Sequence, residues 1–169
     1  MSMIGVAKTE VRESDQSDLR EKYLQSLSLI ERLHRQLLDV IKDDFERGGD
    51  WDINSVQALL LFNIGDQEMT AGELRSRGHY LGSNVSYNLK KLVDSGYINH
   101  QRSDVDRRSV RVRLTESGRS VHDRVDQLFN HQLSSMEEIG GISTEDFEDI
   151  NTTLIKLERF WADQIRYRL

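Results

Sequence analysis

The chain of 169 residues contains no proline. Proline is the residue that most strongly interrupts a helix, so its absence leaves glycine and capping residues to end each helix. Apolar residues recur every three or four positions over most of the chain, which is the spacing of one helical face. The sequence therefore predicts a mainly α-helical protein whose helices are separated by glycines.

Amphipathic patterns flank the middle of the chain. One runs over residues 18–47, and another fills residues 116–169, where Gly140 and Gly141 divide it. An apolar stripe on a helix has to be covered, so we expect these helices to pack with each other or with a second copy of the chain. The polar stretch 1–17 is expected to form a flexible arm.

Residues 53–115 have a different order of elements. Asn54 with Gln57, and Thr70 with Glu73, have the spacing of capping boxes, which mark helix starts. A helix over 83–95 should end at Gly96, and 97–103 and 109–115 have strand character on either side of a polar tip. Short helix, turn, second helix and hairpin together predict a winged helix-turn-helix with a small two-stranded β wing.

Positive charge is concentrated in this middle part. The chain has a formal net charge of -6, yet residues 70–115 hold nine Lys or Arg and four Asp or Glu, a local net charge of +5. The rest of the chain therefore carries a net charge of -11. Such a basic module suits a surface that meets a phosphate backbone. A solvated charged face is the alternative for any charge cluster, but here the charge coincides with the predicted helix-turn-helix and wing.

The predicted helix over 83–95 has a polar face opposite Val85, Leu89 and Leu92, because each residue turns the helix by about 100°. Asn can pair with adenine edges, Ser and Tyr can reach bases or phosphates, and Lys can bind phosphate. An ordinary solvated helix surface would have a similar composition. The residues of this helix that we predict to contact DNA are Ser83, Asn84, Ser86, Tyr87, Lys90 and Lys91.

The predicted wing tip carries Arg107 and Arg108. Arginines on a turn can enter a narrow minor groove, where the negative potential is strong. Asp106 would weaken DNA binding unless it has another role, and we expect it to hold an arginine or brace the hairpin. Arg111 and Arg113 share one face of a strand and would reach either phosphates or solvent.

Several classes of protein are not expected. Cysteine is absent, which excludes disulfides and thiolate zinc sites. The histidines are scattered without an HExxH motif, and no nucleophile elbow or phosphate-binding glycine loop occurs, so we expect no metal, no cofactor and no enzyme. No apolar run approaches the roughly 20 residues of a membrane span, and no secretory signal is recognisable. A cytoplasmic protein is the expectation.

Residues 106–118, DRRSVRVRLTESG, resemble the wing of MarR-family transcriptional regulators. In that family an Asp-x-Arg precedes a Leu-Thr that opens the next helix, and the matching residues here are Asp106, Arg108, Leu114 and Thr115. Residues 53–61, INSVQALLL, resemble the family's second helix. Residues 85–98, VSYNLKKLVDSGYI, resemble its recognition helix and first wing strand.

This resemblance implies a homodimer that binds a palindromic operator, with one recognition helix from each copy in successive major grooves. Residues 18–47 and 116–169 would be the dimerisation helices, and 53–115 the DNA-binding domain. The resemblance also implies a small, often aromatic ligand that alters DNA affinity. His34, Trp51 and Phe62 are our candidates for its pocket, although His34 also suits a core or interface position and the two aromatic residues suit the core.

Residues 75–97 further resemble an alphaproteobacterial subgroup that includes LdtR, a regulator linked to an L,D-transpeptidase gene and to cell-wall remodelling. Cell-wall or stress genes are the targets that this resemblance implies. A protein of another class stays open as the alternative: a winged-helix protein–protein interaction module whose basic face meets an acidic protein.

Overall fold

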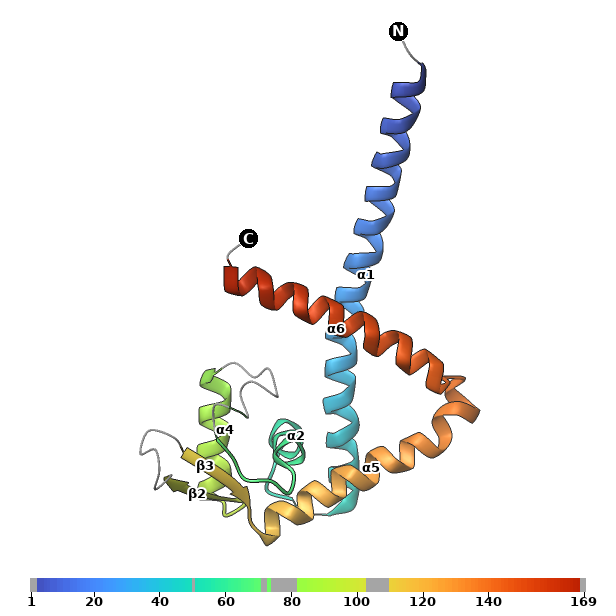
Figure 1. Ribbon diagram of the computed structural model, residues 1–169. Coiled ribbons are helices and arrows are strands. Elements are labelled where there is room, and N and C mark those ends of the chain that lie inside the picture. Colours follow the sequence, from blue (N-terminus) through green and yellow to red (C-terminus); the bar gives the residue numbers. More distant parts are fainter. Residues whose placement is uncertain (1–2, 50, 71–72, 74–81, 103–109, 168–169) are drawn as a thin grey trace. The chain divides into compact units, whose positions relative to one another are not determined.

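The computed structural model describes residues 3–49, 51–70, 73, 82–102 and 110–167 (Figure 1). Two compact units divide the chain, Met1–His122 and Asp123–Leu169, and the division falls inside a helix. The described part is mainly helical with a small antiparallel sheet, as predicted. Its helices are α1 (Met3–Gly48), α2 (Ser55–Ile64), α4 (Gly82–Asp94), α5 (Glu116–Gly140) and α6 (Thr144–Tyr167), and its strands are β1 (Met69–Thr70), β2 (Ile98–Arg102) and β3 (Val110–Leu114).

Helix α1 is longer than the sequence suggested. It starts at Met3, whereas the amphipathic pattern suggested a start near residue 18. The division into an N-terminal arm and a dimerisation helix stays a prediction. Residues 6–17 contain no glycine or proline. Once a helix has formed, each further residue adds a hydrogen bond at little cost, so the amphipathic part of α1 can propagate toward the N-terminus.

The core of the first unit forms where the end of α1 meets α2. Ile41 and Phe45 of α1 are buried, as are Ala58, Leu60, Leu61 and Ile64 of α2. The predicted capping box of α2 is confirmed: Gln57 N donates to Asn54 Oδ1 at 2.9 Å, and Asn54 N donates to Gln57 Oε1 at 3.1 Å. The cap fixes where α2 begins, and its apolar sequence buries it on most sides.

The sheet has three strands in the order β1-β3-β2, all antiparallel. Its β2–β3 hairpin is the predicted wing, in which Ile98 lies opposite Leu114 and His100 opposite Val112. Strand β1 was not predicted, because two residues are too short to show an alternating pattern. It adds Met69 opposite Val112, and the side chains of Met69, Ile98, Val112 and Leu114 are buried. The wing is thereby tied to the core through its central strand.

The second unit contains the rest of α5 and all of α6. Gly141, with φ of +61°, separates the two helices, as predicted. Ser143 and Asp146 cap α6 reciprocally: Asp146 N donates to Ser143 Oγ at 3.2 Å, and Ser143 N donates to Asp146 Oδ2 at 2.8 Å. None of the described residues of α6 is buried.

Candidate nucleic-acid interface

Helix α4 is held by its apolar face. Leu89 and Leu92 are buried, with 8% and 1% of their surfaces exposed. The side chains of Ser86, Tyr87, Lys90 and Lys91 are exposed, which agrees with the helical geometry because they lie away from the leucines. Tyr87, the aromatic residue among them, has 61% of its surface exposed. The described part of the predicted reading face is therefore open to a partner.

Tyr87 and Lys91 lie one helical turn apart and contact each other. The Lys91 Nζ lies 5.4 Å from the centre of the Tyr87 ring, within the range of a cation–π interaction worth about 0.5–1 kcal/mol at an exposed site. This interaction restricts the ring and the ammonium together. A surface that combines a fixed aromatic ring with a positive charge can contact both base edges and phosphates.

The other predicted DNA contacts cannot be placed in the same way. Ser83 and Asn84 belong to the first turn of α4, but their side chains lie outside the described residues. The wing-tip residues Asp106, Arg107 and Arg108 also lie outside them. Their roles stay predictions.

The two strand arginines differ in their surroundings. Both Arg111 and Arg113 have exposed side chains and share a face of β3, as predicted. The Arg111 Nη1 lies 3.3 Å from Glu68 Oε2, and Glu68 precedes β1. Sequence reasoning missed this acidic partner because it lies far from Arg111 along the chain. Within the pair the charge of Arg111 is partly neutralised, whereas Arg113 extends the basic surface.

The base of the wing is fastened to α5. Thr115 donates its backbone N–H to Tyr97 O at 3.0 Å and its hydroxyl to Gly96 O at 2.7 Å. The same hydroxyl accepts a bond from Gly118 N at 3.1 Å, which confirms Thr115 as the cap of α5. Arg119 adds an ion pair with Asp66 at 2.5 Å. The Thr115 bonds fix the base of the hairpin relative to the start of α5, and the Arg119–Asp66 pair joins α5 to the segment between α2 and β1.

Comparison with known proteins agrees with this geometry. Residues 53–118 match the family model of a winged helix DNA-binding domain. The chain is 35% identical over 159 residues to ExpG, the exopolysaccharide II synthesis transcriptional activator of Rhizobium meliloti (strain 1021), and the match covers 94% of this chain and 81% of ExpG. A mutant MarR from E. coli, solved in complex with operator DNA, has a TM-score of 0.60 at 20% identity, and the match covers 76% of this chain and 90% of that MarR. The chain belongs to the MarR family.

A second solved MarR-like structure supports the assignment. FabT of Streptococcus pneumoniae, solved in complex with DNA, is 26% identical to this chain. Its TM-score is 0.60, and the match covers 83% of this chain and 98% of FabT. The protein is therefore a DNA-binding transcriptional regulator of the MarR type, a family of regulators and not of enzymes.

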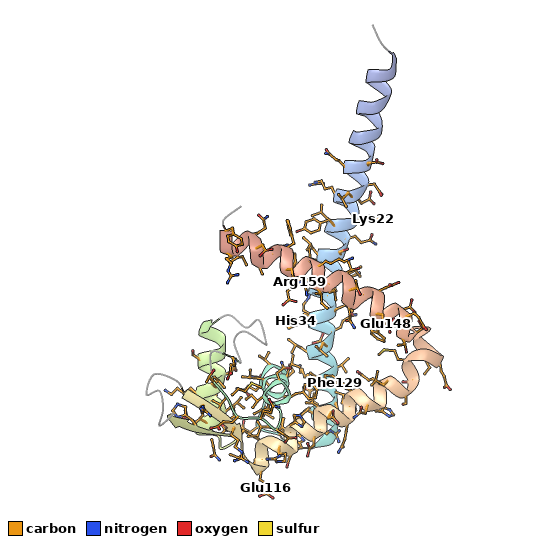
Figure 2. All side chains as sticks on the ribbon, viewed as in Figure 1. Lys22, His34, Glu116, Phe129, Glu148 and Arg159 are labelled. Carbon is orange, nitrogen blue, oxygen red and sulfur yellow. The ribbon has the colours of Figure 1, made fainter. Side chains whose placement is uncertain are left out.

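The candidate residues for a ligand pocket of this MarR-type regulator have separate surroundings. His34 lies exposed on α1 (Figure 2). Trp51 is half-buried and packs edge-on against Phe45, with ring centres 5.3 Å apart. Phe62 stacks on His122, also at 5.3 Å. Trp51 lines a cavity of about 460 Å³ whose other walls are Lys42, Phe45, Glu46, Gly49, Ile53, Asn54 and Ser55.

Neither metal binding nor membrane insertion finds support in the described residues. No group of three or more His, Asp or Glu side chains there is arranged to hold a metal ion. Over the same ranges, no helix combines the length and the apolar character that crossing a membrane requires.

Proposed function

We propose that this MarR-type regulator works as a homodimer that reads a palindromic operator, with α4 of each copy in a major groove. The observation that carries the proposal is the exposed, cationic face of α4 opposite its buried Leu89 and Leu92. The E. coli MarR mutant and FabT, which share the fold, were both solved with DNA. An exposed helix face of this kind has the dimensions that the major groove admits.

A second copy is the partner that we propose for α6. This helix exposes apolar side chains over its whole length, which isolated soluble helices cannot sustain. They are Phe147, Ile150, Leu154, Ile155, Phe160, Trp161 and Ile165. Residues 18–47 of α1 and residues 116–169 would form the dimerisation region, and a two-fold axis between copies would match a palindromic site.

Different residues of the DNA-binding domain would make different kinds of contact with DNA. Ser83, Asn84, Ser86 and Tyr87 would read base edges, with Asn84 placed to pair with adenine. Lys90 and Lys91 would hold phosphates near the groove. Arg107 and Arg108 would enter the minor groove beside it, and Asp106 would brace the wing.

Titration of duplex DNA at low and high salt tests this assignment. The wild-type chain should bind its operator with a steep salt dependence, and Arg107→Ala/Arg108→Ala should reduce the slope by about 0.9 for each phosphate that the variant no longer neutralises. Arg20→Ala/Arg35→Ala, which removes two exposed arginines of α1, is the matched control and should keep the slope. Equal affinity of the wild-type chain for promoter fragments and random duplex would contradict specific regulation and favour the protein-interaction module.

Asn84 gives a separate test of base reading. Asn84→Ala should relax the preference at one operator position, by about 1–3 kcal/mol for a good bidentate pair. It should leave the salt slope almost unchanged, because amide contacts to bases release no counterions. A reduced slope with an intact preference would instead assign Asn84 to the phosphate backbone.

The regulated genes and the ligand response are also proposals. ExpG is named for exopolysaccharide synthesis, and the narrower resemblance to the LdtR subgroup concerns the cell wall, so we expect operators near genes of the cell envelope or of stress responses. Selection of genomic fragments bound by the protein tests this expectation directly. A small aromatic ligand bound beside Trp51 would alter the affinity for these operators.

A further inference from the structure

Tyr87 lies at the centre of the exposed face of α4. Each residue turns a helix by about 100°, so the buried Leu89 and Leu92 lie about 200° and 140° around the axis from Tyr87. Lys90 lies about 60° to one side of Tyr87 and Lys91 about 40° to the other, and all three side chains are exposed. When α4 enters a major groove with this face first, which rests on the proposed function, Tyr87 meets the bases and the two lysines face phosphates.

The Tyr87 ring has a partner on one of its faces. The Lys91 Nζ lies over the ring, 5.4 Å from its centre, because side chains on a helix lean toward its N-terminus and Lys91 follows Tyr87 by one turn. The attraction between the cation and the ring face opposes rotation of the ring. Tyr87 still has 61% of its surface exposed, so a held aromatic surface remains open to DNA.

An aromatic ring that faces the base edges is suited to an apolar group. In the major groove, thymine is the base whose edge presents a methyl group, on C5. The nitrogen and oxygen atoms of the other edges would lose hydrogen bonds to water if they packed against ring carbon atoms. We propose that Tyr87 is a specificity-determining residue whose ring reads the C5 methyl group of one thymine in each half-site, and that Lys91 is the positioning residue that holds the ring.

Lys91 can hold the ring and bind a phosphate at the same time. Its ammonium group has three N–H donors, and the attraction to the ring is electrostatic, so donors remain for a phosphate oxygen. The ring and the phosphate contact then belong to residues one helical turn apart. Tyr87 and Lys91 would therefore read a thymine methyl group at a fixed position relative to the phosphate backbone.

Uracil in place of thymine tests the proposal, because uracil lacks only the C5 methyl group. The probe is a palindromic duplex recovered by selection of genomic fragments, in which each thymine is replaced in turn, symmetrically in both half-sites. One position should weaken binding about fourfold per half-site, or about fifteenfold for the symmetric pair, which is the loss expected from about 0.8 kcal/mol per buried carbon group. Half-sites that contain no thymine, or no position that responds to uracil, would overturn the proposal.

Variants of Tyr87 identify the group that reads the methyl group. Tyr87→Phe keeps the ring and should keep the uracil effect. Tyr87→Ala should bind the thymine and uracil duplexes equally, and its exposed position leaves the fold intact. If the full uracil effect persists in Tyr87→Ala, another residue reads the methyl group. If the effect is lost in Tyr87→Phe, the hydroxyl group makes the contact instead of the ring, and either result overturns the proposal.

The two lysines beside Tyr87 separate positioning from charge. Lys90→Met and Lys91→Met each remove one exposed cation of α4 and should each reduce the salt slope by about 0.9 for each phosphate contact that is lost. The ammonium over the ring is that of Lys91, so Lys90→Met is the matched control and should keep the uracil effect. Lys91→Met should reduce it from about fourfold to about twofold per half-site, in line with an exposed cation–π interaction. Equal uracil effects in the two variants would remove Lys91 as a positioning residue.

The uracil titrations distinguish failure of this proposal from failure of operator reading. A wild-type chain that prefers its palindrome over random duplex, and responds to uracil at no position, still reads an operator but does not read a methyl group. A wild-type chain without preference for any duplex contradicts the operator reading and the methyl contact together.

Discussion

At the scale of single residues, the junction between the wing and α5 is unusually close. A Cβ atom at Gly118 would collide with the backbone carbonyl oxygen of Tyr97. The same carbonyl accepts the Thr115 N–H, so it cannot move away without loss of that bond. Sequence reasoning assigned Thr115 as a helix cap but missed Gly118, whose need for a small residue is visible only when the hairpin is in place.

Gly118→Ala should therefore destabilise the protein, although alanine normally favours a helix over glycine by about 1 kcal/mol. Overpacking against a backbone atom costs about 1–3 kcal/mol, and this cost should exceed the gain. Chemical denaturation measures the change in the free energy of unfolding. Ser117→Ala, at the exposed neighbouring position, is the control. A more stable Gly118→Ala chain would show that the junction can relax.

The pair of Arg111 and Glu68 leads to a second prediction at this scale. Glu68→Gln removes the charge that faces Arg111 at 3.3 Å, so the arginine becomes available to phosphate. We expect tighter DNA binding and a salt slope steeper by about 0.9. The free energy of unfolding should change little, because an exposed ion pair contributes at most about 1 kcal/mol to it. Asp39→Asn removes the same charge from α1, and an equal gain in that variant would assign the effect to net charge instead of Arg111.

At the scale of elements, the start of α6 responds to pH. Hydrogen bonds from the backbone N–H and then the side chain of Ser143 lower the pKa of Asp146 below its ordinary value of 3.8. The ionised carboxylate accepts these bonds, so the cap is complete above pH 3.8 and is lost as the pH falls through the lowered pKa. An NMR titration of the Asp146 carboxyl group checks the direction. In Ser143→Ala the pKa should rise toward its ordinary value, and an unchanged pKa would leave the backbone bond as the whole cause.

The starting residues of helices were the part of the secondary structure that the sequence predicted best. Asn54 with Gln57, a predicted capping box, forms reciprocal hydrogen bonds, because capping depends only on residues three apart. Ser143 with Asp146 forms the same kind of pair at the start of α6. Thr70 and Glu73 form the same reciprocal bonds, at 2.6 Å and 3.1 Å, while the short helix predicted after them lies outside the described residues. Strand β1 could not be predicted, since its two residues pair only once β3 lies beside them. The extension of α1 was missed because a polar composition was interpreted as the absence of structure.

Side-chain partners were harder to predict than elements. The polar face of α4 followed from helical spacing alone, and the exposure of Tyr87, Lys90 and Lys91 agrees with it. Glu68 and Asp66, which hold Arg111 and Arg119, depend on contacts between residues far apart in the sequence. Candidates for the ligand pocket were chosen as aromatic residues, and the structure gives Trp51 and Phe62 different neighbours.

At the scale of the whole molecule, charge and apolar surface are separated along the chain. Residues 70–115 carry a net charge of +5 and the rest carries -11, so the acidic remainder is repelled by DNA and favours an orientation with the basic module toward the phosphates. The apolar side chains of α6 lie within the acidic remainder. In the proposed homodimer, contact through α6 would use residues of this acidic remainder and none of the basic residues in 70–115.

Leu154→Asp tests the pairing of two copies. A carboxylate placed among the exposed apolar residues of α6 should be buried on dimerisation, at a cost that weakens the dimer at least about tenfold. Light scattering over a range of protein concentrations measures this change. Thr152→Asp, at an exposed position about 200° around the helix from Ile150, should leave the dimer intact. A Leu154→Asp chain that dimerises like the wild type would remove α6 from the interface.

The great length of α1 has a consequence for the cell. Its 46 residues span about 70 Å, and the side chains of residues 15–26 are exposed along the whole stretch. The exposed end of a long helix is marginal in water, so in the proposed homodimer this end of α1 would be more fully formed when the second chain lies against it. Coiling of that end and pairing of two chains would then be a single equilibrium. The concentration of the regulator in a cell would then set the helical fraction of this end of α1. The hydrogen-exchange rates of its amides would report the fraction of chains that are paired.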